Sequence, residues 1–386
     1  MQVSDIKEKF VRLFGGDSGF LVFHSPGRVN LIGEHTDYNG GYVFPCALTF
    51  GTYGIAGKRR DNILRLASTN FEGEIFEVSL DAVVYDRKYG WANYLLGVVN
   101  QFQKLGMGVG GLDVLISGDM PASAGLSSSA SIEMLMSVII NTLYDCGLPM
   151  LELVKLSQRA ENQFVGLNCG IMDQFAVGMG QKDKAMLLNC NTLEYQYIPI
   201  ILDEHYLIIG NTNNPRGLAG SKYNERRAEC KKAVAMLRVK LDIELLGDIT
   251  PEVFEANKHL ITDETVLKRA THVIYEIERT KEAAARLADG DLATFGQLMY
   301  DSHNSLADLY EVTGHALDTM VDAAKKQTGV LGSRMTGGGF GGCTVSLIEK
   351  AHIDTFIENV GREYKEKTGI GADFYIAGIG DGTRQL

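Results

Sequence analysis

The feature of this sequence that most constrains its fold is a change of pattern between residues 200 and 220. Before it, short apolar runs typical of strands alternate with a few helices, and after it long charged helices dominate. At 386 residues the chain is also long for a single hydrophobic core. We therefore predict an α+β protein of two domains, residues 1–203 and 204–386.

The spacing of apolar residues predicts the individual elements. Strands are expected over residues 21–25, 51–57, 63–67, 112–117, 185–189, 205–211, 342–347 and 374–377. Helices are expected over residues 1–16, 89–105, 127–144, 151–165, 221–241, 263–288, 291–309, 315–328 and 353–367.

Composition and charge exclude several classes of protein. Hydrophobic residues make up 45% of the chain and charged residues 22%, which is ordinary for a folded protein and argues against general disorder. The formal net charge of -11 argues against duplex nucleic acid as a partner, because phosphate contacts need a basic face. It does not exclude a nucleotide, since backbone N–H groups and a metal ion can hold phosphates on an acidic protein.

The six cysteines are scattered, without a CxxC pair or a Cys/His cluster of zinc spacing. Scattered thiols in a chain of this size are typical of reduced core residues, so we expect a cytoplasmic protein. Residues 1–16 have the pattern of an amphipathic helix and lack the apolar centre of a secretory signal. No apolar run is long enough to span a membrane, and no membrane partner is expected.

Residues 120–131 (MPASAGLSSSAS) have the most distinctive composition. Small residues allow a tight turn, and the serines stand where a long helix begins. Free N–H groups at a helix start form an anion site, and a serine hydroxyl there can bind Mg²⁺ beside the phosphates. An ordinary serine N-cap is the alternative, but Gly125 followed by three serines favours phosphate binding. The segment is not a Walker A loop, because no Gly-Lys-Ser/Thr follows.

Residues 25–41 (SPGRVNLIGEHTDYNGG) place four ionisable side chains in a stretch rich in Gly, Pro and Asn. Such a density of hydrogen-bonding groups on a rigid loop suits a ligand made mostly of hydroxyls, although a solvated turn between strands is the simpler alternative.

A further segment, residues 168–174 (NCGIMDQ), sets Asp173 among apolar neighbours just after a helix that carries Glu161. From the residues alone, a structural aspartate and a catalytic one both remain open there.

Glycines cluster in residues 334–344 (RMTGGGFGGCT), which contain a formal GxGxxG at Gly337, Gly339 and Gly342. A second formal match falls at residues 106–111. Dinucleotide binding needs a strand before the glycines and a helix after them. We interpret each match as following a helix and leading into a strand, and we therefore reject a Rossmann site. A close approach of the backbone to a bound ligand or to the partner domain is the better interpretation.

Together these segments resemble the signatures of the GHMP kinases and, within them, of the galactokinase family. Residues 27–41 resemble the galactokinase signature, residues 125–131 the shared ATP loop and residues 336–342 the third motif. The order and spacing match from about residue 20 to the C-terminus. The resemblance implies the two-domain GHMP kinase fold, with an N-terminal domain similar to ribosomal protein S5 domain 2 and a C-terminal ferredoxin-like α+β domain.

The resemblance also implies an activity and its residues. The activity is transfer of the γ-phosphoryl group of Mg-ATP to the C1 hydroxyl of α-D-galactose, which gives galactose 1-phosphate and ADP. Asp173 matches the catalytic aspartate, and Arg28 the arginine that stabilises negative charge. Ser129 and Glu161 match the Mg²⁺ ligands. The positions that match sugar contacts are Glu34, His35, Thr36, Asp37, Gly170 and Tyr223. Those that match nucleotide contacts are Ser68, Trp91, Ser123, Ala124, Gly125, Leu126, Ser127, Ser128 and Ser129.

Two positions depart from the family pattern. Ser123 stands where many relatives have glycine, which adds strain if the position needs a positive φ. Asn168 replaces a proline that is frequent before Cys-Gly-Ile-Met-Asp, which can loosen the loop that presents Asp173.

Two alternatives remain open at this point. One is a related kinase for N-acetylgalactosamine or arabinose, because the sugar pocket cannot be sized from sequence. The other is a transcriptional regulator that binds galactose and ATP without catalysis. The complete serine run and the presence of both Arg28 and Asp173 favour the enzyme. We expect a monomer.

Overall fold

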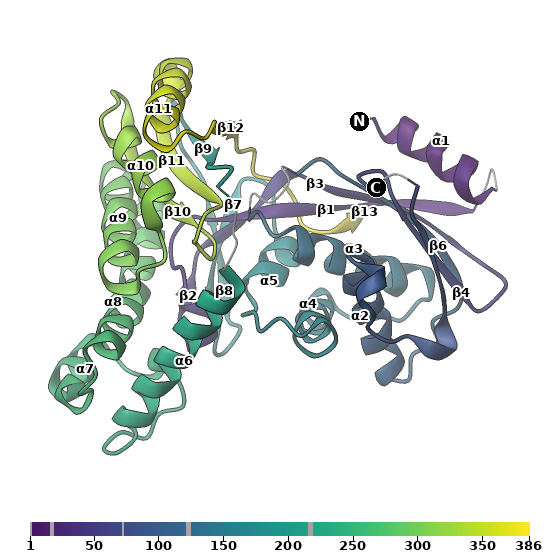
Figure 1. The fold of residues 1–386 in the computed structure, drawn as a ribbon, viewed down its shortest axis with the longest axis horizontal. Helices are drawn as coiled ribbons and strands as arrows, with labels where there is room; N and C mark the ends of the chain where they lie inside the picture. The colour runs from purple at the N-terminus through teal and green to yellow at the C-terminus, as the bar shows by residue number, and fades with distance from the viewer. Residues whose placement is uncertain (1, 16–18, 72, 121–124, 215–218) are drawn as a thin grey trace.

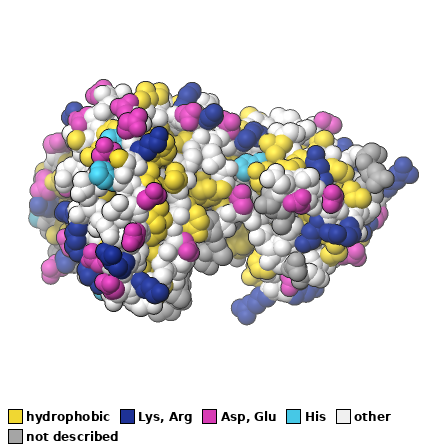
Figure 2. All heavy atoms as spheres, turned by 90° about the horizontal axis from the view of Figure 1, so that it is seen from above, with side chains coloured by type: hydrophobic (Ala, Val, Ile, Leu, Met, Phe, Trp, Pro, Cys, Tyr) yellow, Lys and Arg dark blue, Asp and Glu magenta, His cyan; other side chains and the backbone are white. Residues whose placement is uncertain are grey.

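The computed structural model describes residues 2–15, 19–71, 73–120, 125–214 and 219–386. Figure 1 shows an elongated molecule with two lobes. The long strands β1 and β3 run through one lobe, and the long helices of the second half of the chain form the other. Figure 2 shows the molecule from above, with charged side chains of both signs spread over this face and a hollow between the lobes.

The first lobe is built on a six-stranded sheet. Neighbouring strands are antiparallel except β4 and β6, which run parallel. The order across the sheet is β13 (Arg384–Gln385), β1 (Phe20–Asn30), β3 (Pro45–Lys58), β6 (Leu112–Gly118), β4 (Ile63–Ser68) and β5 (Ile75–Ser79).

Alternate residues of these strands face opposite sides of the sheet, and both sides are covered. On β3, Ile55 packs against the N-terminal helix, whereas its neighbour Ala56 belongs to the larger core on the other side. The N-terminal helix is amphipathic as predicted and buries Ile6 and Phe10, one turn apart. The helices of this lobe are α1 (Val3–Phe14), α2 (Ala92–Lys104), α3 (Ser128–Leu143), α4 (Met150–Arg159) and α5 (Met172–Met179).

The second lobe combines a four-stranded antiparallel sheet with long helices. The order across this sheet is β10 (Val330–Thr336), β11 (Cys343–Glu349), β9 (His205–Asn211) and β12 (Asp373–Ile376). Its helices are α6 (Ala219–Leu237), α7 (Pro251–Asn257), α8 (Glu264–Ala288), α9 (Leu292–Ser305), α10 (Gly314–Lys325) and α11 (Ile353–Thr368). A third sheet has the order β2 (Tyr42–Val43), β7 (Lys184–Asn189) and β8 (Tyr195–Pro199).

Short helical turns complete the fold. Those of 3₁₀ type are Asp37–Asn39, Leu80–Ala82, Arg87–Tyr89, Leu246–Asp248, Lys258–Leu260 and Lys350–His352. Two π-helical turns, Ala160–Val165 and Leu306–Tyr310, extend the ends of α4 and α9. Such turns often mark functional positions, and the first of them carries Glu161.

The two lobes are connected by segments from both ends of the chain. The loop after β1 reaches the helical lobe, where the Gly33 amide donates to Glu276 Oε1 of α8 over 3.1 Å. In the other direction, the C-terminal strand β13 pairs with β1 of the first sheet. The first lobe thus includes the C-terminal strand β13, and the second lobe is contacted by the loop after β1, so each lobe involves residues from both sides of position 203.

The α+β class and the division into two parts agree with the prediction. Strand β9 has the predicted bounds, 205–211, and α3 begins at Ser128, beside its predicted start. The short helices α5 and α7 and the strands β2, β5, β8, β10 and β13 were not predicted. Among the described residues, no helix is both long enough and apolar enough to cross a membrane.

One prediction about the glycine cluster is wrong. Residues 337–342 do not follow a helix, because they connect strands β10 and β11. Strand β10 was not predicted, because Ser333 and Arg334 are polar although they are completely buried. The run therefore lacks the apolar residues by which a buried strand is recognised. The rejection of a Rossmann site is unaffected, since no helix follows the glycines. The match at residues 106–111 does lie between a helix, α2, and a strand, β6.

Candidate active site

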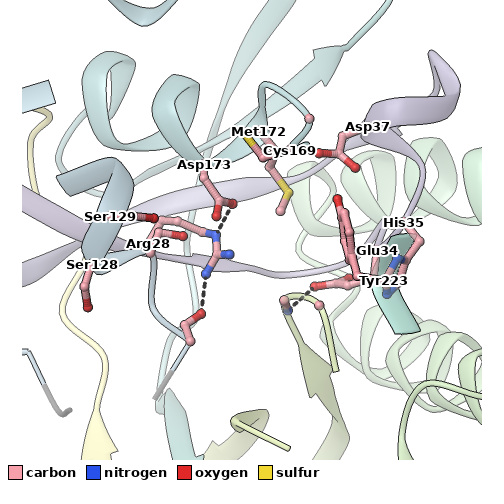
Figure 3. Close-up of a pocket in the computed structure, with 15 residues that line it drawn as sticks. Arg28, Glu34, His35, Asp37, Ser128, Ser129, Cys169, Met172, Asp173 and Tyr223 are labelled. Carbon is pink, nitrogen blue, oxygen red and sulfur yellow. Dashed lines mark hydrogen bonds and ion pairs between the residues drawn. The ribbon is translucent and has the colours of Figure 1, made fainter. Parts of the chain in front are cut away.

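A cavity of about 290 Å³ lies between the lobes. It collects residues that are far apart in the chain: the end of β1, the loop after it, the starts of α3 and α5, helix α6 and the turn after β10. Figure 3 shows Ser128 and Ser129 at one end of this cavity and Asp37, His35 and Tyr223 at the other. Its lining is Arg28, Glu34, His35, Asp37, Gly125, Ser127, Ser128, Ser129, Cys169, Gly170, Met172, Asp173, Tyr223, Gly337 and Gly338.

Arg28 and Asp173 form an ion pair in the middle of this cavity (Figure 3). Arg28 Nε donates to Asp173 Oδ1 over 2.8 Å, and Nη1 donates to the carbonyl of Gly125 over 2.9 Å. The arginine is 4% exposed and the aspartate 30%. One guanidinium thus holds the carboxylate and the backbone that leads into α3 in a fixed relation.

Local structure explains how both side chains reach the cavity. The pairing of β1 with β3 shifts register between Pro26 and Arg28, and such a bulge redirects the side chains that follow it. Asp173 lies in the first turn of α5, immediately after the loop that carries Gly170. The carboxylate is therefore presented by a helix start, where a negative charge is favoured.

Glu34 is completely buried at the end of the cavity that is away from Ser128 and Ser129. It forms an ion pair with Arg334 and accepts from the Gly337 amide over 3.0 Å. Burial raises the pKa of Glu34, and the guanidinium of Arg334 opposes that shift. The Glu34 carboxylate, on the loop after β1, is thus held by strand β10 and by the turn that follows it.

His35 and Asp37 follow Glu34 on the same loop. His35 has a left-handed backbone, φ 64, and its Nδ1 lies 2.8 Å from the hydroxyl of Tyr38. Burial lowers the pKa of His35 to about 3, so its ring is neutral near pH 7. Burial, and then the charge of Asp173, raise the pKa of Asp37 to about 6. A neutral ring and a carboxyl that titrates near neutrality suit recognition of uncharged hydroxyls.

Gly170 and Tyr223 complete this end. A Cβ atom on Gly170 would lie 1.7 Å from Asp37 Oδ2, so only glycine leaves room for that carboxyl group. The ring of Tyr223, from α6, lies 5.6 Å from that of His35 and 5.3 Å from that of Tyr38, centre to centre. Five of the six predicted sugar contacts therefore line one cavity.

Thr36 is the sixth, and it does not line the cavity. Its hydroxyl is near the carbonyls of Gly33 and Tyr42, at 2.8 and 2.7 Å, and it is completely buried. Leu126 of the phosphate loop is also absent from the lining and belongs to the hydrophobic core. Its carbonyl accepts from the Arg28 amide over 3.1 Å. Ser123 and Ala124 lie outside the described residues.

The serine turn has the features of an anion site. Ser127 precedes α3 with a left-handed backbone, φ 65, which a serine adopts at a cost. Its hydroxyl oxygen is buried and has no hydrogen-bond partner among the described residues. Ser128 and Ser129 begin α3, where helix N–H groups are free to bind phosphate.

Ser129 and Glu161, the predicted metal ligands, lie next to each other. The Ser129 hydroxyl is close enough to the Glu161 carboxylate to lower its pKa, and Glu161 also accepts from Gln174 Nε2 over 2.6 Å. Burial raises the pKa of Glu161, and the Cys169 thiol, 3.3 Å away, opposes the shift. No cluster of three or more His, Cys, Asp or Glu side chains in the described part of the chain forms a metal cage. A pair of oxygen ligands beside a phosphate site fits Mg²⁺, which keeps waters and phosphate oxygens as its other ligands.

A second cavity, of about 420 Å³, opens on the other side of the serine turn. Ser128 and Ser129 line both cavities. Ser68 and Trp91, predicted near the nucleotide, line this one together with Phe71. The rings of Trp91 and Phe71 are nearly parallel, 6.2 Å apart, and the indole N–H is buried without a partner among the described residues. Apolar walls with an unused donor fit a nucleotide base.

Four lining residues were not assigned from sequence: Cys169, Met172, Gly337 and Gly338. All four belong to segments that the sequence singled out, but no signal in those segments says which side chains face a ligand. Arg334 is a fifth, since it acts on the site through Glu34 without lining the cavity.

Comparison with known proteins places this architecture in a family. The model of the galactokinase galactose-binding signature matches residues 8–58, that of the GHMP kinase N-terminal domain residues 93–181, and that of the GHMP kinase C-terminal domain residues 280–366. A galactokinase from Fusobacterium nucleatum is 56% identical over 387 residues, covering 100% of both chains. The chain belongs to the galactokinase family.

Other members and solved structures agree with this assignment. The Bacillus subtilis galactokinase is 51% identical over 99% of this chain and 98% of its own. The crystal structure of Lactococcus lactis galactokinase complexed with galactose matches with a TM-score of 0.97 and 47% identity over the whole of both chains. Methanococcus jannaschii mevalonate kinase matches with a TM-score of 0.63 at 16% identity over 94% of this chain and 99% of its own, which shows a shared fold.

Proposed function

We propose that this protein is a galactokinase that transfers the γ-phosphoryl group of ATP to the C1 hydroxyl of α-D-galactose. The products are galactose 1-phosphate and ADP. Family membership supports ATP-dependent phosphorylation of a sugar, and full-length relatives at 50–56% identity support galactose as that sugar.

The observation that carries the proposal is the position of the Arg28–Asp173 pair. It lies between the loop of Glu34, His35 and Asp37 and the serine turn (Figure 3). A sugar hydroxyl held by that loop and a phosphate held by the serine turn would meet beside the Arg28–Asp173 pair. Phosphoryl transfer depends mainly on such positioning and on stabilisation of charge.

The proposed role of Asp173 is to accept or orient the proton of the C1 hydroxyl. Its Oδ1 is held by Arg28 Nε, and its other oxygen, which has no hydrogen-bond partner among the described residues, can face the sugar. The guanidinium, only 4% exposed, lies in a low-dielectric position, where it stabilises negative charge that develops on the transferred group. Because the transition state is loose, orientation of the nucleophile contributes more than its full deprotonation.

The α3 amides and the hydroxyls of Ser127 and Ser128 are proposed to hold the phosphates, and the cavity of Ser68 and Trp91 the base. Ser129 and Glu161 are proposed to hold Mg²⁺, which neutralises phosphate charge when it is bound. We also propose a cytoplasmic monomer. No disulfide joins the six cysteines, all of which lie in the described part of the chain, and this supports a reducing compartment.

A kinase for N-acetylgalactosamine or arabinose and a non-catalytic sensor are the competing functions. ADP release from Mg-ATP distinguishes them when galactose, N-acetylgalactosamine, arabinose and glucose are compared as substrates. We expect kcat/KM to be highest for galactose, because a site built to bind each hydroxyl rejects a sugar that leaves a buried group unpaired. Higher kcat/KM for another sugar would reassign the substrate, and galactose binding without turnover of any sugar would favour the sensor.

A further inference from the structure

Behind the proposed metal ligands lies a carboxyl group that no other observation explains. Glu133 is on α3, four residues after Ser129, so both side chains lie on the same face of the helix. Its exposed fraction is 0%. No ion pair to Glu133 is present within the described residues, and a buried carboxyl without a cation is costly to keep. A buried carboxyl group of this kind is a candidate for a functional role.

The hydrogen bonds of Glu133 lead directly to Glu161. Gln174 Nε2 donates to Glu133 Oε2 over 3.0 Å and to Glu161 Oε2 over 2.6 Å. The same amide group therefore joins a carboxyl on α3 to the carboxylate on the π-helical turn after α4. All three side chains are closed to bulk solvent, at 0%, 0% and 6% exposure for Glu133, Gln174 and Glu161.

Resting on the proposed function, we propose that Glu133 is a positioning residue that holds the Gln174 amide and, through it, orients the Glu161 carboxylate beside Ser129 for a divalent cation. Without Glu133, the Gln174 amide would keep only its bond to Glu161 and a long contact to Cys169 Sγ among the described residues. Held by Glu133, the amide restrains Glu161 Oε2 and with it the orientation of the carboxylate. Outer partners of this kind orient metal ligands and affect metal affinity by about 10–100-fold.

The unused atoms of the network fit this assignment. Glu133 Oε1 and Gln174 Oε1 are both buried and have no partner among the described residues. A protonated Glu133 would keep the observed bond from the amide N–H and would add an O–H donor for a buried acceptor such as the amide oxygen. Burial, and then the charge of Glu161, raise the pKa of Glu133 well above its ordinary value, in keeping with such a neutral pair.

The test measures the factor by which Mg²⁺ tightens ADP binding, as the ratio of the dissociation constants in EDTA and in Mg²⁺. Glu133→Met keeps the side-chain length and removes both oxygens, so we expect this factor to fall about tenfold or more. Glu133→Gln retains the acceptor and the donor and should keep the factor. ADP affinity in EDTA and galactose affinity should be unchanged in both variants, which separates metal positioning from general damage.

Two further variants complete the experiment. Gln174→Met breaks the link from the other side and should lose as much of the factor as Glu133→Met, with no further loss in the double variant. Ser137→Ala, one turn further along the same face of α3 and bonded to Ser157, is the control and should keep it. If Glu133→Met does not fold, Gln174→Met alone must show the loss.

An unchanged factor in Glu133→Met or Gln174→Met would overturn the inference. A loss in Glu133→Gln as large as that in Glu133→Met would also overturn it, because charge rather than geometry would then be the cause. If wild-type protein itself binds no ADP, or binds it equally with and without Mg²⁺, the proposed function fails instead.

Discussion

Arg334 and Glu34 form an ion pair that is closed to solvent, with exposed fractions of 0% and 1%. The two residues lie 300 positions apart in the sequence, and they join the end of β10 to the loop that carries Glu34, His35 and Asp37. Arg334 Nη1 also lies 3.3 Å from the carbonyls of Asn30 and Leu31. A residue outside the cavity therefore controls the shape of the loop that forms it.

Arg334→Met should be strongly destabilising, because it leaves the buried Glu34 carboxylate without its cation. Removal of one partner of a buried pair costs about 3–5 kcal/mol. Urea unfolding followed by circular dichroism measures the loss. The double variant Arg334→Met/Glu34→Gln should recover part of it. A single variant whose free energy of unfolding stays within about 1 kcal/mol of wild type would contradict this account of the pair.

Gly170→Ala should weaken galactose binding, because the added Cβ would lie 1.7 Å from Asp37 Oδ2 and must displace that carboxyl group. A displaced hydrogen-bonding group costs about 1–3 kcal/mol, so the dissociation constant should rise about tenfold or more in calorimetry. Gly108→Ala is the matched control, since its Cβ would meet nothing within 4 Å. Equal affinities in the two variants would show that Asp37 does not contact the sugar.

Galactose affinity should fall as the pH drops through about 6. The pKa of Asp37 is raised from 3.8 to about 6, so below that pH the carboxyl is protonated and loses acceptor capacity. His35, with a pKa of about 3, does not titrate in this range. In the sugar-free protein the sign is opposite for stability. The folded state holds the proton more tightly, so the contribution of Asp37 to the free energy of unfolding is present below about pH 4 and is lost as the pH rises from about 4 to about 6.

Asp37→Asn is the matched control for the pH effect. Its galactose affinity, measured by calorimetry between about pH 5 and pH 8, should be weaker than that of wild type above pH 6 and nearly constant. The same slope in Asp37→Asn as in wild type would assign the titration to another group.

Nucleotide binding should change the intrinsic tryptophan fluorescence. The chain has one tryptophan, Trp91, and it lines the cavity beside the serine turn. A base that stacks there alters the surroundings of the indole, whereas the proposed galactose site lies on the far side of that turn. Addition of ADP should shift or quench the emission, and galactose alone should not. Binding of ADP seen by calorimetry without any change in emission would place the base elsewhere.

Much of the site was predictable because its residues stand in unusual local segments. The run from Gly125 to Ser129 predicts a tight turn followed by a helix start. In the structure this turn lines the cavity. Arg28, Asp37 and Asp173 were found through the family resemblance, and the structure brings all three together.

What the sequence could not supply are relations between distant residues. Arg334 was noted only for the glycines after it, because nothing local reveals an ion pair across 300 positions of chain. Glu133 looks like an ordinary polar position of α3, although it is completely buried. The π-helical turn that carries Glu161 also has no pattern that apolar spacing detects.

The most direct test of the central claim is phosphorus NMR of the product formed from Mg-ATP and galactose by wild type and by Asp173→Asn. The account predicts one new phosphomonoester signal that is coupled to the anomeric proton. The rate of its formation should fall about 10²–10⁴-fold in the variant, with galactose still bound. A product phosphorylated on another hydroxyl, or an unchanged rate in Asp173→Asn, would contradict transfer to C1 beside the Arg28–Asp173 pair.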